Sequence, residues 1–385
     1  MAYKRLLNFK LPKGQSAFLW GARKTGKTTY LKNKYPKSIF FDFLKTDLYL
    51  DFIRKPFLLR ERLLAMGKKA LAHPVILDEV QKVPQILDEV QWLIENKKIS
   101  FILCGSSARK LKRGGANLLG GRAWRFEMRP LVYKEITDFN LLKALNQGAI
   151  PDHYLQNEKS SRKSLQAYTQ DYLKEEIFAE GLVRNIPAFT RFFDVLTYSH
   201  GEMINYANIA RDCSVDAKTI KAYFQILEDT LLATLIDPFK KRQNRQVISK
   251  APKFYLFDTG VAGFLCKRLL AEPRGAAFGK AFEHFIFNEI NAYRAYSDKG
   301  FQINYWRTKT GLEVDFVLGR GEVAVEVKTG GIDARETKGL RAFIEEYAPK
   351  KALIVCTEKY ERVSGKIRVM PWQVFLSKLW DGKII

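Results

Sequence analysis

The stretch "GARKTGKTT", residues 21–29, constrains the fold of this chain more than any other part of the sequence. It follows the short apolar run "AFLW" and precedes a stretch of residues that favours a helix. Gly21, Gly26, Lys27 and Thr28 complete the pattern G-x-x-x-x-G-K-[ST], in which backbone N–H groups wrap a phosphate at a helix N-terminus. The context of strand, loop and helix therefore predicts a phosphate-binding loop.

This loop is expected to bind ATP together with Mg²⁺. Lys27 would reach the β- and γ-phosphates, and the hydroxyl of Thr28 would be a ligand of the metal ion. The residues predicted to contact the nucleotide are Gly21, Ala22, Arg23, Lys24, Thr25, Gly26, Lys27, Thr28, Thr29 and, from a later strand, Ser106.

A second apolar run, "PVILDEVQ" (residues 74–81), contains two adjacent acids. Asp78 is expected to hold Mg²⁺, and Glu79 is expected to orient or deprotonate the attacking water. A third run, "SFILCGSS", ends in Ser106 and Ser107, which would touch the γ-phosphate or the water, or would only form a turn.

Apolar runs alternate with helical stretches over the first 130 residues, and "SIFFDF" (residues 38–43) adds another buried strand. This alternation predicts a parallel sheet with helices on both faces. The following Arg- and Gly-rich segment is expected to form loops that reach a neighbouring subunit. Arg122 is the first candidate for a charge-neutralising arginine and Arg113 the second. Surface charge or DNA contact is an equal alternative for both.

Residues 130–200 have the apolar spacing of amphipathic helices and are expected to form a lid on the nucleotide domain. Residues 204–236 then predict a short helix, a turn, a second helix that begins near Asp216, and apolar strands. This is the order of a winged helix. The predicted DNA-contacting residues lie on the second helix and in the basic segment 240–253: Lys218, Lys221, Lys240, Lys241, Arg242 and Arg245. Packing only against protein is the alternative.

The stretch "EVDFVLGRGEVAVEVKTG", residues 313–330, predicts a β-hairpin with polar residues at alternate positions. A two-residue loop would set Asp315 opposite Glu326, on the face that also carries Lys328. Glu283, on a predicted helix upstream, would complete the set. Glu283, Asp315 and Glu326 would gather Mg²⁺, and Lys328 would help to orient or deprotonate water, which are the parts needed to hydrolyse a phosphodiester. An ordinary solvated sheet face is the alternative.

Composition supports a nucleic-acid partner, because 65 Lys and Arg residues against 41 Asp and Glu give a net charge of +24. The four cysteines are scattered, so a zinc site or a disulfide framework is not expected. The sequence contains no run of about 18 apolar residues, so no membrane partner is expected. These features together predict a cytoplasmic protein.

Residues 1–135 resemble the AAA-type P-loop domain of a family of prokaryotic ATPases, through "FLWGARKTGKTTYL", "VILDEVQ", "ILCGSSARKL" and "GGRAWRFEMRPL". Residues from about 165 to 329 resemble the C-terminal region paired with that domain, long classed as of unknown function. There "AFGKAFEHFIFNEI" and "YWRTKTGLEVDFVL" look like a PD-(D/E)XK nuclease core. The resemblance implies an α/β chain with an AAA+ P-loop domain (1–135), a helical lid (136–195), a winged helix (196–260) and a nuclease-like α/β domain (261–385).

The function expected from these features is ATP hydrolysis by a DNA-associated homo-oligomer. Its tail would cut branched or altered DNA with the help of Mg²⁺. The alternative is an ATPase switch whose C-terminal domain binds DNA or a protein partner without cleavage.

Overall fold

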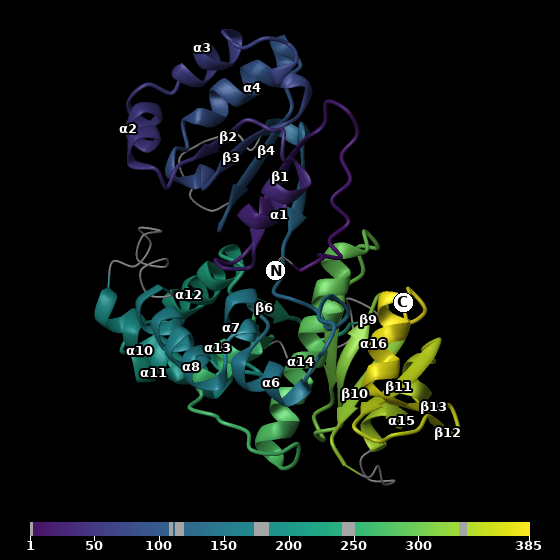
Figure 1. Cartoon of the computed structure of the whole chain (residues 1–385). Helices are drawn as coiled ribbons and strands as arrows, with labels where there is room; N and C mark the ends of the chain where they lie inside the picture. Colours follow the sequence, from purple (N-terminus) through teal and green to yellow (C-terminus); the bar gives the residue numbers. More distant parts are fainter. Residues whose placement is uncertain (1–2, 108–110, 112–118, 173–184, 241–250, 331–336) are drawn as a thin grey trace. The chain divides into compact units, whose positions relative to one another are not determined.

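The computed structural model describes residues 3–107, 111, 119–172, 185–240, 251–330 and 337–385 (Figure 1). The chain divides into two compact units. The first contains Met1–Pro130 with Asp229–Leu232, and the second contains Leu131–Glu228 with Ala233–Ile385. The helices expected as a lid of the nucleotide domain therefore fall in the second unit, together with the expected winged-helix and nuclease-like regions.

The described part of the first unit forms a five-stranded sheet in the order β2-β3-β4-β1-β5. All four pairings are parallel, as predicted. Strand β5 was not predicted, because it lies in the Arg- and Gly-rich segment expected to form loops. The strands are β1 (Ser16–Trp20), β2 (Phe40–Asp42), β3 (Val75–Asp78), β4 (Phe101–Gly105) and β5 (Ala123–Glu127).

Helices cover both faces of this sheet (Figure 1). On one face Phe18 and Trp20 lie in an apolar cluster with residues of three helices, α2 (Thr46–Arg54), α3 (Leu58–Leu64) and α4 (Ile86–Lys97). On the other face Phe9 packs against Phe126 of β5 and against Tyr30 of α1 (Lys27–Lys34). Single 3₁₀ turns lie at Ala70–Ala72, Val80–Lys82 and Leu119–Gly121.

The second unit begins with helices. After a 3₁₀ turn at Tyr133–Glu135 come α6 (Leu141–Gln147), α7 (Pro151–Leu155), α8 (Glu158–Ala167), the π-helical segment η5 (Tyr168–Tyr172), α10 (Ile186–Leu196) and a 3₁₀ turn, η6 (Thr197–Ser199). The predicted helix-turn-helix follows as α11 (Tyr206–Cys213) and α12 (Ala217–Asp229), with Ser214 in the left-handed conformation between them. Asp216 caps α12 as expected, since its Oδ1 accepts a hydrogen bond from the backbone N–H of Thr219 at 2.7 Å.

Strands β6 (Ala233–Ile236) and β7 (Lys253–Leu256) then pair antiparallel, and α13 (Thr259–Leu265) follows. This order of helices and strands agrees with the predicted one. Tyr223 of α12 is buried against Phe189 and Phe192 of α10.

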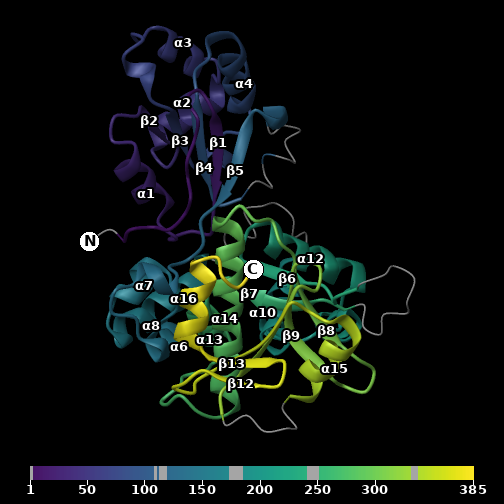
Figure 2. The same cartoon turned by 90° about the vertical axis from the view of Figure 1, so that its right-hand side faces the viewer.

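The C-terminal half of the second unit contains a mixed sheet of six strands in the order β12-β13-β11-β10-β9-β8. Figure 2 shows its strands β8, β9, β12 and β13. Its strands are β8 (Ile303–Arg307), β9 (Glu313–Leu318), β10 (Val323–Lys328), β11 (Lys351–Cys356), β12 (Arg362–Ser364) and β13 (Ile367–Pro371). Strands β10, β11 and β13 run parallel, whereas β8, β9 and β12 pair antiparallel with their neighbours.

Alternating side chains divide this sheet between two apolar clusters. Val323, Val325 and Leu353 pack with α14 (Ala276–Tyr296) and α16 (Trp372–Trp380). Ala324 and Ile354 pack with α15 (Lys338–Tyr347) on the opposite face. The sheet is thus covered on both faces, which takes its polar residues out of bulk water. No helix in the described part of the chain is long and apolar enough to cross a membrane.

Candidate functional sites: a P-loop and a buried acid cluster

The predicted phosphate-binding loop joins the C-terminal end of β1 to the N-terminus of α1. Gly26 has φ 93° and Lys24 has φ 62°, so the loop turns through left-handed backbone, which glycine adopts without steric cost. A Cβ atom at Gly21 would lie 2.5 Å from the carbonyl oxygen of Met128, so this position also needs glycine. These constraints explain the glycines of the motif.

Lys27 is buried at the base of the loop, and its Nζ donates hydrogen bonds to the carbonyl oxygens of Gly21 (2.7 Å) and Ala22 (3.1 Å). Thr25 fixes the same turn, since its hydroxyl donates to the carbonyl of Ala22 at 2.8 Å. Helix α1 has no acid in its first turn. A buried ammonium group and the positive end of a helix therefore meet at one place, which suits a phosphate anion.

Thr28 and Asp78 lie together at the same edge of the sheet. The hydroxyl of Thr28 donates to Oδ2 of Asp78 at 2.6 Å, and Asp78 is buried at the end of β3. A hydroxyl and a carboxylate are oxygen ligands of the kind that Mg²⁺ prefers. The two predicted metal ligands of this unit are thus in direct contact, and the pair fits the ion.

Glu79 follows with φ 55° and is also buried. Burial raises the pKa of Glu79, and the ammonium of Lys27 partly opposes this effect. The side-chain amide of Gln81 donates both to the Glu79 carboxylate and to the hydroxyl of Ser106, the latter at 3.1 Å. Gln81 therefore links the predicted water-activating acid to the predicted γ-phosphate contact.

Sequence reasoning did not single out Gln81. Its only signal in the sequence is its place two residues after Glu79. The structure adds a second signal, because a Cβ atom at Gly105 would lie 2.2 Å from Oε1 of Gln81. The glycine before Ser106 thus leaves the space that the Gln81 amide occupies.

Arg122 lies just before β5, at the opposite end of the sheet from the P-loop, because Ala123 pairs with Ser16 and Glu127 with Trp20. Its Nη2 forms an ion pair of 2.6 Å with Oε1 of Glu95. Arg122 therefore lies away from the P-loop of its own unit, and its action on a neighbouring subunit stays a prediction. Arg113 lies outside the described residues.

The hairpin of β9 and β10 has the predicted register near its loop. Leu318 pairs with Val323 and Phe316 with Val325, and continuation of this register would set Asp315 opposite Glu326. On the other side of β9, however, Asn304 pairs with Val317 and Trp306 with Val314. Two residues of β9, Asp315 and Phe316, therefore face the single residue Tyr305, which is a β-bulge.

The bulge corrects the expected arrangement of side chains. Regular alternation along β9 would set Val314 and Phe316 on the same face, yet Val314 packs on the α15 side and Phe316 on the α14 side. Oδ2 of Asp315 accepts a hydrogen bond from the backbone N–H of Val327 at 2.8 Å, in the place of a ladder bond. The bulge thus breaks the alternation between Val314 and Phe316, whereas Asp315 and Glu326 still lie near enough for the charge of Asp315 to raise the pKa of Glu326.

A buried lysine lies among the acids, and it was not predicted. The Nζ of Lys253, on β7, forms an ion pair with the Glu313 carboxylate and lies 3.9 Å from Oε1 of Glu283. It also lies 5.5 Å from the ring centre of Tyr305. The hydroxyl of Tyr255 donates to Oε1 of Glu283 at 2.5 Å. In the sequence, Lys253 is only one of the basic residues of segment 240–253, which was predicted to contact DNA.

The charges of this cluster act on one another. Burial works to lower the pKa of Lys253, but the carboxylates of Glu283, Asp315 and Glu313 outweigh it and raise the pKa. Burial, together with the charge of Asp315, raises the pKa of Glu283 to about 7. Burial is also the main cause that raises the pKa of Asp315 and of Glu326.

Glu326 and Lys328 form an ion pair of 2.8 Å between Oε1 and Nζ. Oε2 of Glu326 is buried and has no hydrogen-bond partner among the described residues. Within the same described residues, no group of three or more His, Cys, Asp or Glu side chains is arranged to hold a metal ion. Glu283, Asp315 and Glu326 are therefore not arranged as such a group in the described part of the chain.

Lys218, Lys221 and Lys240 are exposed. Lys221 lies 5.4 Å from the ring centre of Tyr206 on the preceding helix. Lys241, Arg242 and Arg245, the other predicted DNA contacts, lie outside the described residues. The described part of the predicted interface thus has accessible cations on and after α12.

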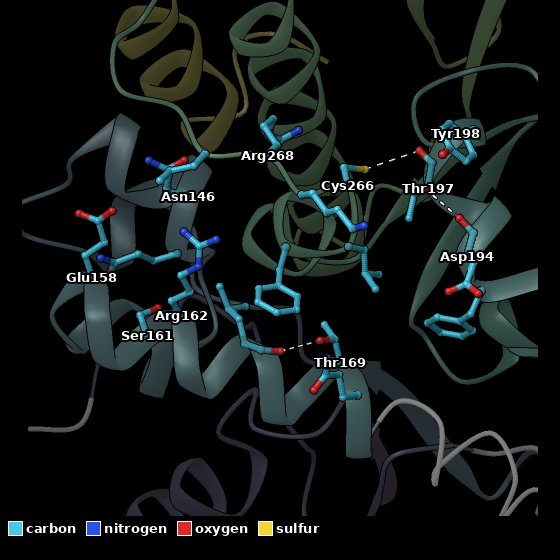
Figure 3. Close-up of a pocket in the computed structure, with 18 of the residues that line it drawn as sticks. Asn146, Glu158, Ser161, Arg162, Thr169, Asp194, Thr197, Tyr198, Cys266 and Arg268 are labelled. Atoms are coloured by element: carbon cyan, nitrogen blue, oxygen red, sulfur yellow. Dashed lines mark hydrogen bonds between the residues drawn. The ribbon is translucent and has the colours of Figure 1, made fainter. Parts of the chain in front are cut away.

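A cavity of about 590 Å³ lies in the second unit, between α8, α10 and the end of α13 (Figure 3). Its walls carry Arg162, Arg268 and Lys267 as well as Glu158 and Asp194, so both charges are represented. None of the site residues predicted from the sequence lines it. The mixture of charges does not favour one class of ligand.

Comparison with known protein families agrees with the P-loop geometry. Residues 13–137 match the family model of an AAA domain. Residues 139–271 match a domain of unknown function (DUF8612), and residues 278–375 match another (DUF4143). A single family thus covers most of the region predicted as lid and winged helix.

Three uncharacterized proteins are similar to the chain. Those of Mycobacterium bovis and Mycobacterium tuberculosis are each 26% identical over 313 residues, which cover 78% of this chain and 66% of the relative. The chain therefore spans just under two thirds of their length. A protein of Methanocaldococcus jannaschii is 23% identical over 349 residues, which cover 82% of this chain and 74% of the relative. The family match, together with the parallel sheet and its P-loop, shows that residues 13–137 are similar to an AAA domain, the type found in nucleotide-binding ATPases.

Proposed function

We propose that the AAA domain binds ATP with Mg²⁺ and hydrolyses it. The observation that carries this proposal is the contact of 2.6 Å between Thr28 and Asp78, which lies at the same end of the sheet as the buried Lys27 and Glu79. All four residue types are the ones that phosphoryl transfer requires. When bound, Mg²⁺ would neutralise negative charge on the phosphates.

Each of these residues has a distinct part in the proposal. Lys27 holds the phosphates by its ammonium group, and its present hydrogen bonds to loop carbonyls show that the group already lies inside the loop. Thr28 and Asp78 supply oxygen ligands. Glu79 orients the attacking water and takes its proton, and Gln81 keeps the Glu79 carboxylate pointed toward Ser106.

The test is steady-state ATP hydrolysis by Lys27→Ala. We expect a loss of about 100-fold or more, because the variant lacks a preorganised charge at the phosphates. Lys32→Ala is the matched control, since Lys32 lies exposed on the same helix and contacts the Phe40 ring rather than the loop. Equal turnover by Lys27→Ala and Lys32→Ala would show that the site is misplaced.

We also propose that the ATPase works as a homo-oligomer in which Arg122 serves a neighbouring subunit. The support is its place at the end of the sheet opposite the P-loop and its exposed side chain. The sharpest test is to mix the two variant proteins Lys27→Ala and Arg122→Ala and to measure ATP hydrolysis. Each variant alone should be inactive. The mixture should regain activity, because some of its interfaces combine an intact P-loop from one subunit with an intact Arg122 from the other. Activity that the mixture fails to regain would remove this role from Arg122.

The second unit is proposed to bind DNA. The net charge of +24 and the exposed Lys218, Lys221 and Lys240 support this. Loss of two phosphate contacts in Lys218→Gln/Lys221→Gln should lower the slope of log affinity against log salt by about 2. Lys350→Gln is the control, because Lys350 is exposed but already pairs with Glu322. A slope that does not change would exclude this helix from the interface.

Two proposals were open for the C-terminal half: Mg²⁺-dependent cleavage of DNA, or binding without cleavage. The buried Lys253 among Glu283, Glu313 and Asp315 favours binding without cleavage.

A further inference from the structure

Lys253 is held at the centre of the acid cluster from several sides. Its ion pairs with Glu313 and Glu283 come from β9 and α14, two elements far from β7 in sequence. The ring of Tyr305 lies 5.5 Å from its Nζ. A cation placed near an aromatic ring and between carboxylates is stabilised by both. The ammonium group is thus part of the packed core rather than a surface charge.

The cluster is close to electrical balance without any added ion. Four acids, Glu283, Glu313, Asp315 and Glu326, are opposed by three bases: Lys253, Lys328, and Arg307, whose Nη1 lies 2.8 Å from Oε2 of Glu313. Four negative charges and three positive charges leave a single net negative charge. A divalent cation would bring two further positive charges into a group whose acids are already almost balanced by these bases.

The carboxylates of the cluster also have partners other than Lys253. Asp315 accepts from the backbone of Val327, Glu283 accepts from Tyr255, and Glu326 pairs with Lys328. Oε2 of Glu326 is the one oxygen of this cluster that is buried without a partner among the described residues. One free oxygen does not replace the several ligands that a hard divalent cation needs.

We infer that Lys253 is a built-in cation that takes the place of the divalent metal in the nuclease-like core, so that the second unit holds no metal ion at these acids and cuts no DNA there. The acids instead tie β7 to β9 and α14 through the ammonium group. This inference rests on the proposal that the C-terminal half does not cleave DNA, and it is independent both of ATP hydrolysis in the first unit and of DNA binding by α12.

The direct test is calorimetric titration of MnCl₂ into the full-length protein. Asp78→Asn is the background variant, because it removes the metal ligand of the P-loop while leaving the second unit unchanged. We expect no binding of Mn²⁺ by Asp78→Asn and none by Asp78→Asn/Asp315→Asn. A stoichiometric binding heat that disappears when Asp315 is replaced would overturn the inference.

A second test measures what Lys253 does for the fold. Lys253→Met leaves the partner acids uncompensated, so its melting temperature should fall, whereas Lys253→Met/Glu313→Gln removes one of those acids and should regain part of the loss. Lys280→Met is the matched control, since Lys280 is an exposed lysine of α14 that pairs with Glu202. Its melting temperature should match that of the wild type. A double variant no more stable than Lys253→Met would contradict the proposed charge balance.

Cleavage assays separate this inference from the proposed function. Branched DNA incubated with the wild-type protein and Mg²⁺ should be bound and left intact. Cleavage that Asp315→Asn abolishes would overturn the inference without affecting the ATPase or DNA-binding proposals. Absence of DNA binding, with no Mn²⁺ bound by Asp78→Asn, would instead overturn the DNA-binding proposal and leave the inference standing.

Discussion

Glu289 is expected to make the second unit less stable as pH rises. The variant Glu289→Gln should therefore be less stable than the wild type at acidic pH and more stable than the wild type at pH 8. The carboxyl group is buried on α14, where Oε1 accepts from the backbone N–H of Tyr133 (2.7 Å) and Oε2 from Nε1–H of Trp380 (2.8 Å). Burial raises the pKa of Glu289 to about 8. The two hydrogen bonds oppose this shift, and the charge of Glu135 adds to it.

Proton binding explains why the free energy of unfolding falls as pH rises. Between the ordinary glutamate pKa of 4.5 and the folded-state pKa of about 8, the folded protein holds a proton that the unfolded chain releases. The stability from this group is therefore present at acidic pH and is lost as pH rises through that window. One pH unit is worth about 1.4 kcal/mol, so the loss between pH 5 and pH 8 is roughly 3 kcal/mol.

Glu289→Gln cannot ionise, but its amide has only one oxygen for the two N–H donors of Tyr133 and Trp380. We expect the variant to be less stable than the wild type at pH 5, by about 1 kcal/mol for the lost hydrogen bond, and more stable at pH 8. Urea unfolding of both proteins at the two pH values measures this difference. The exposed Glu345 provides the control variant Glu345→Gln. A difference in free energy of unfolding that is the same at pH 5 and pH 8 would refute the reasoning.

Two further predictions concern other elements. Gly105→Ala should lower ATP hydrolysis, because the new methyl group would displace the Gln81 amide that holds Glu79, and it would also press against the Trp20 ring. Turnover measures the effect, and circular dichroism checks that the fold is kept. Unchanged turnover would show that Gln81 does not act on Glu79. Asn205→Ala should lower the free energy of unfolding by about 1 kcal/mol, because Oδ1 of Asn205 accepts a hydrogen bond from the N–H of Asn208 at the start of α11. In urea unfolding, Asn205→Asp should retain most of the stability. Equal losses in both variants would argue against the cap.

The first domain could largely be predicted from sequence because its signals are local. Gly26, Lys27 and Thr28 are neighbours in the chain, and the pattern of apolar strands that carries Asp78 requires a parallel sheet. The contact of Thr28 with Asp78 then follows from the order of the strands. Strand β5 was not predicted because its five residues, which include Trp124 and Arg125, form no long apolar run. The segment forms a strand because it pairs with β1.

The acid cluster could be predicted only in part, since its geometry depends on contacts remote in sequence. The alternation of Val323 and Val325 predicted the hairpin and its loop register. The bulge at Asp315 is set by β8, whose pairing the hairpin sequence does not specify. Lys253 lies 30 residues before Glu283 and reads as one more basic residue of a charged segment. Its role as a buried partner appears only when β7 packs beside β9 and α14.

The most direct test of ATP hydrolysis at this site is a comparison of ATP binding and turnover in Glu79→Gln. The amide keeps an oxygen that can accept from Gln81 but cannot take a proton from water. We expect the variant to bind ATP within about threefold of the wild-type affinity. Its rate of ATP hydrolysis should fall to about one hundredth of the wild-type rate or lower. Wild-type turnover in Glu79→Gln would contradict the account.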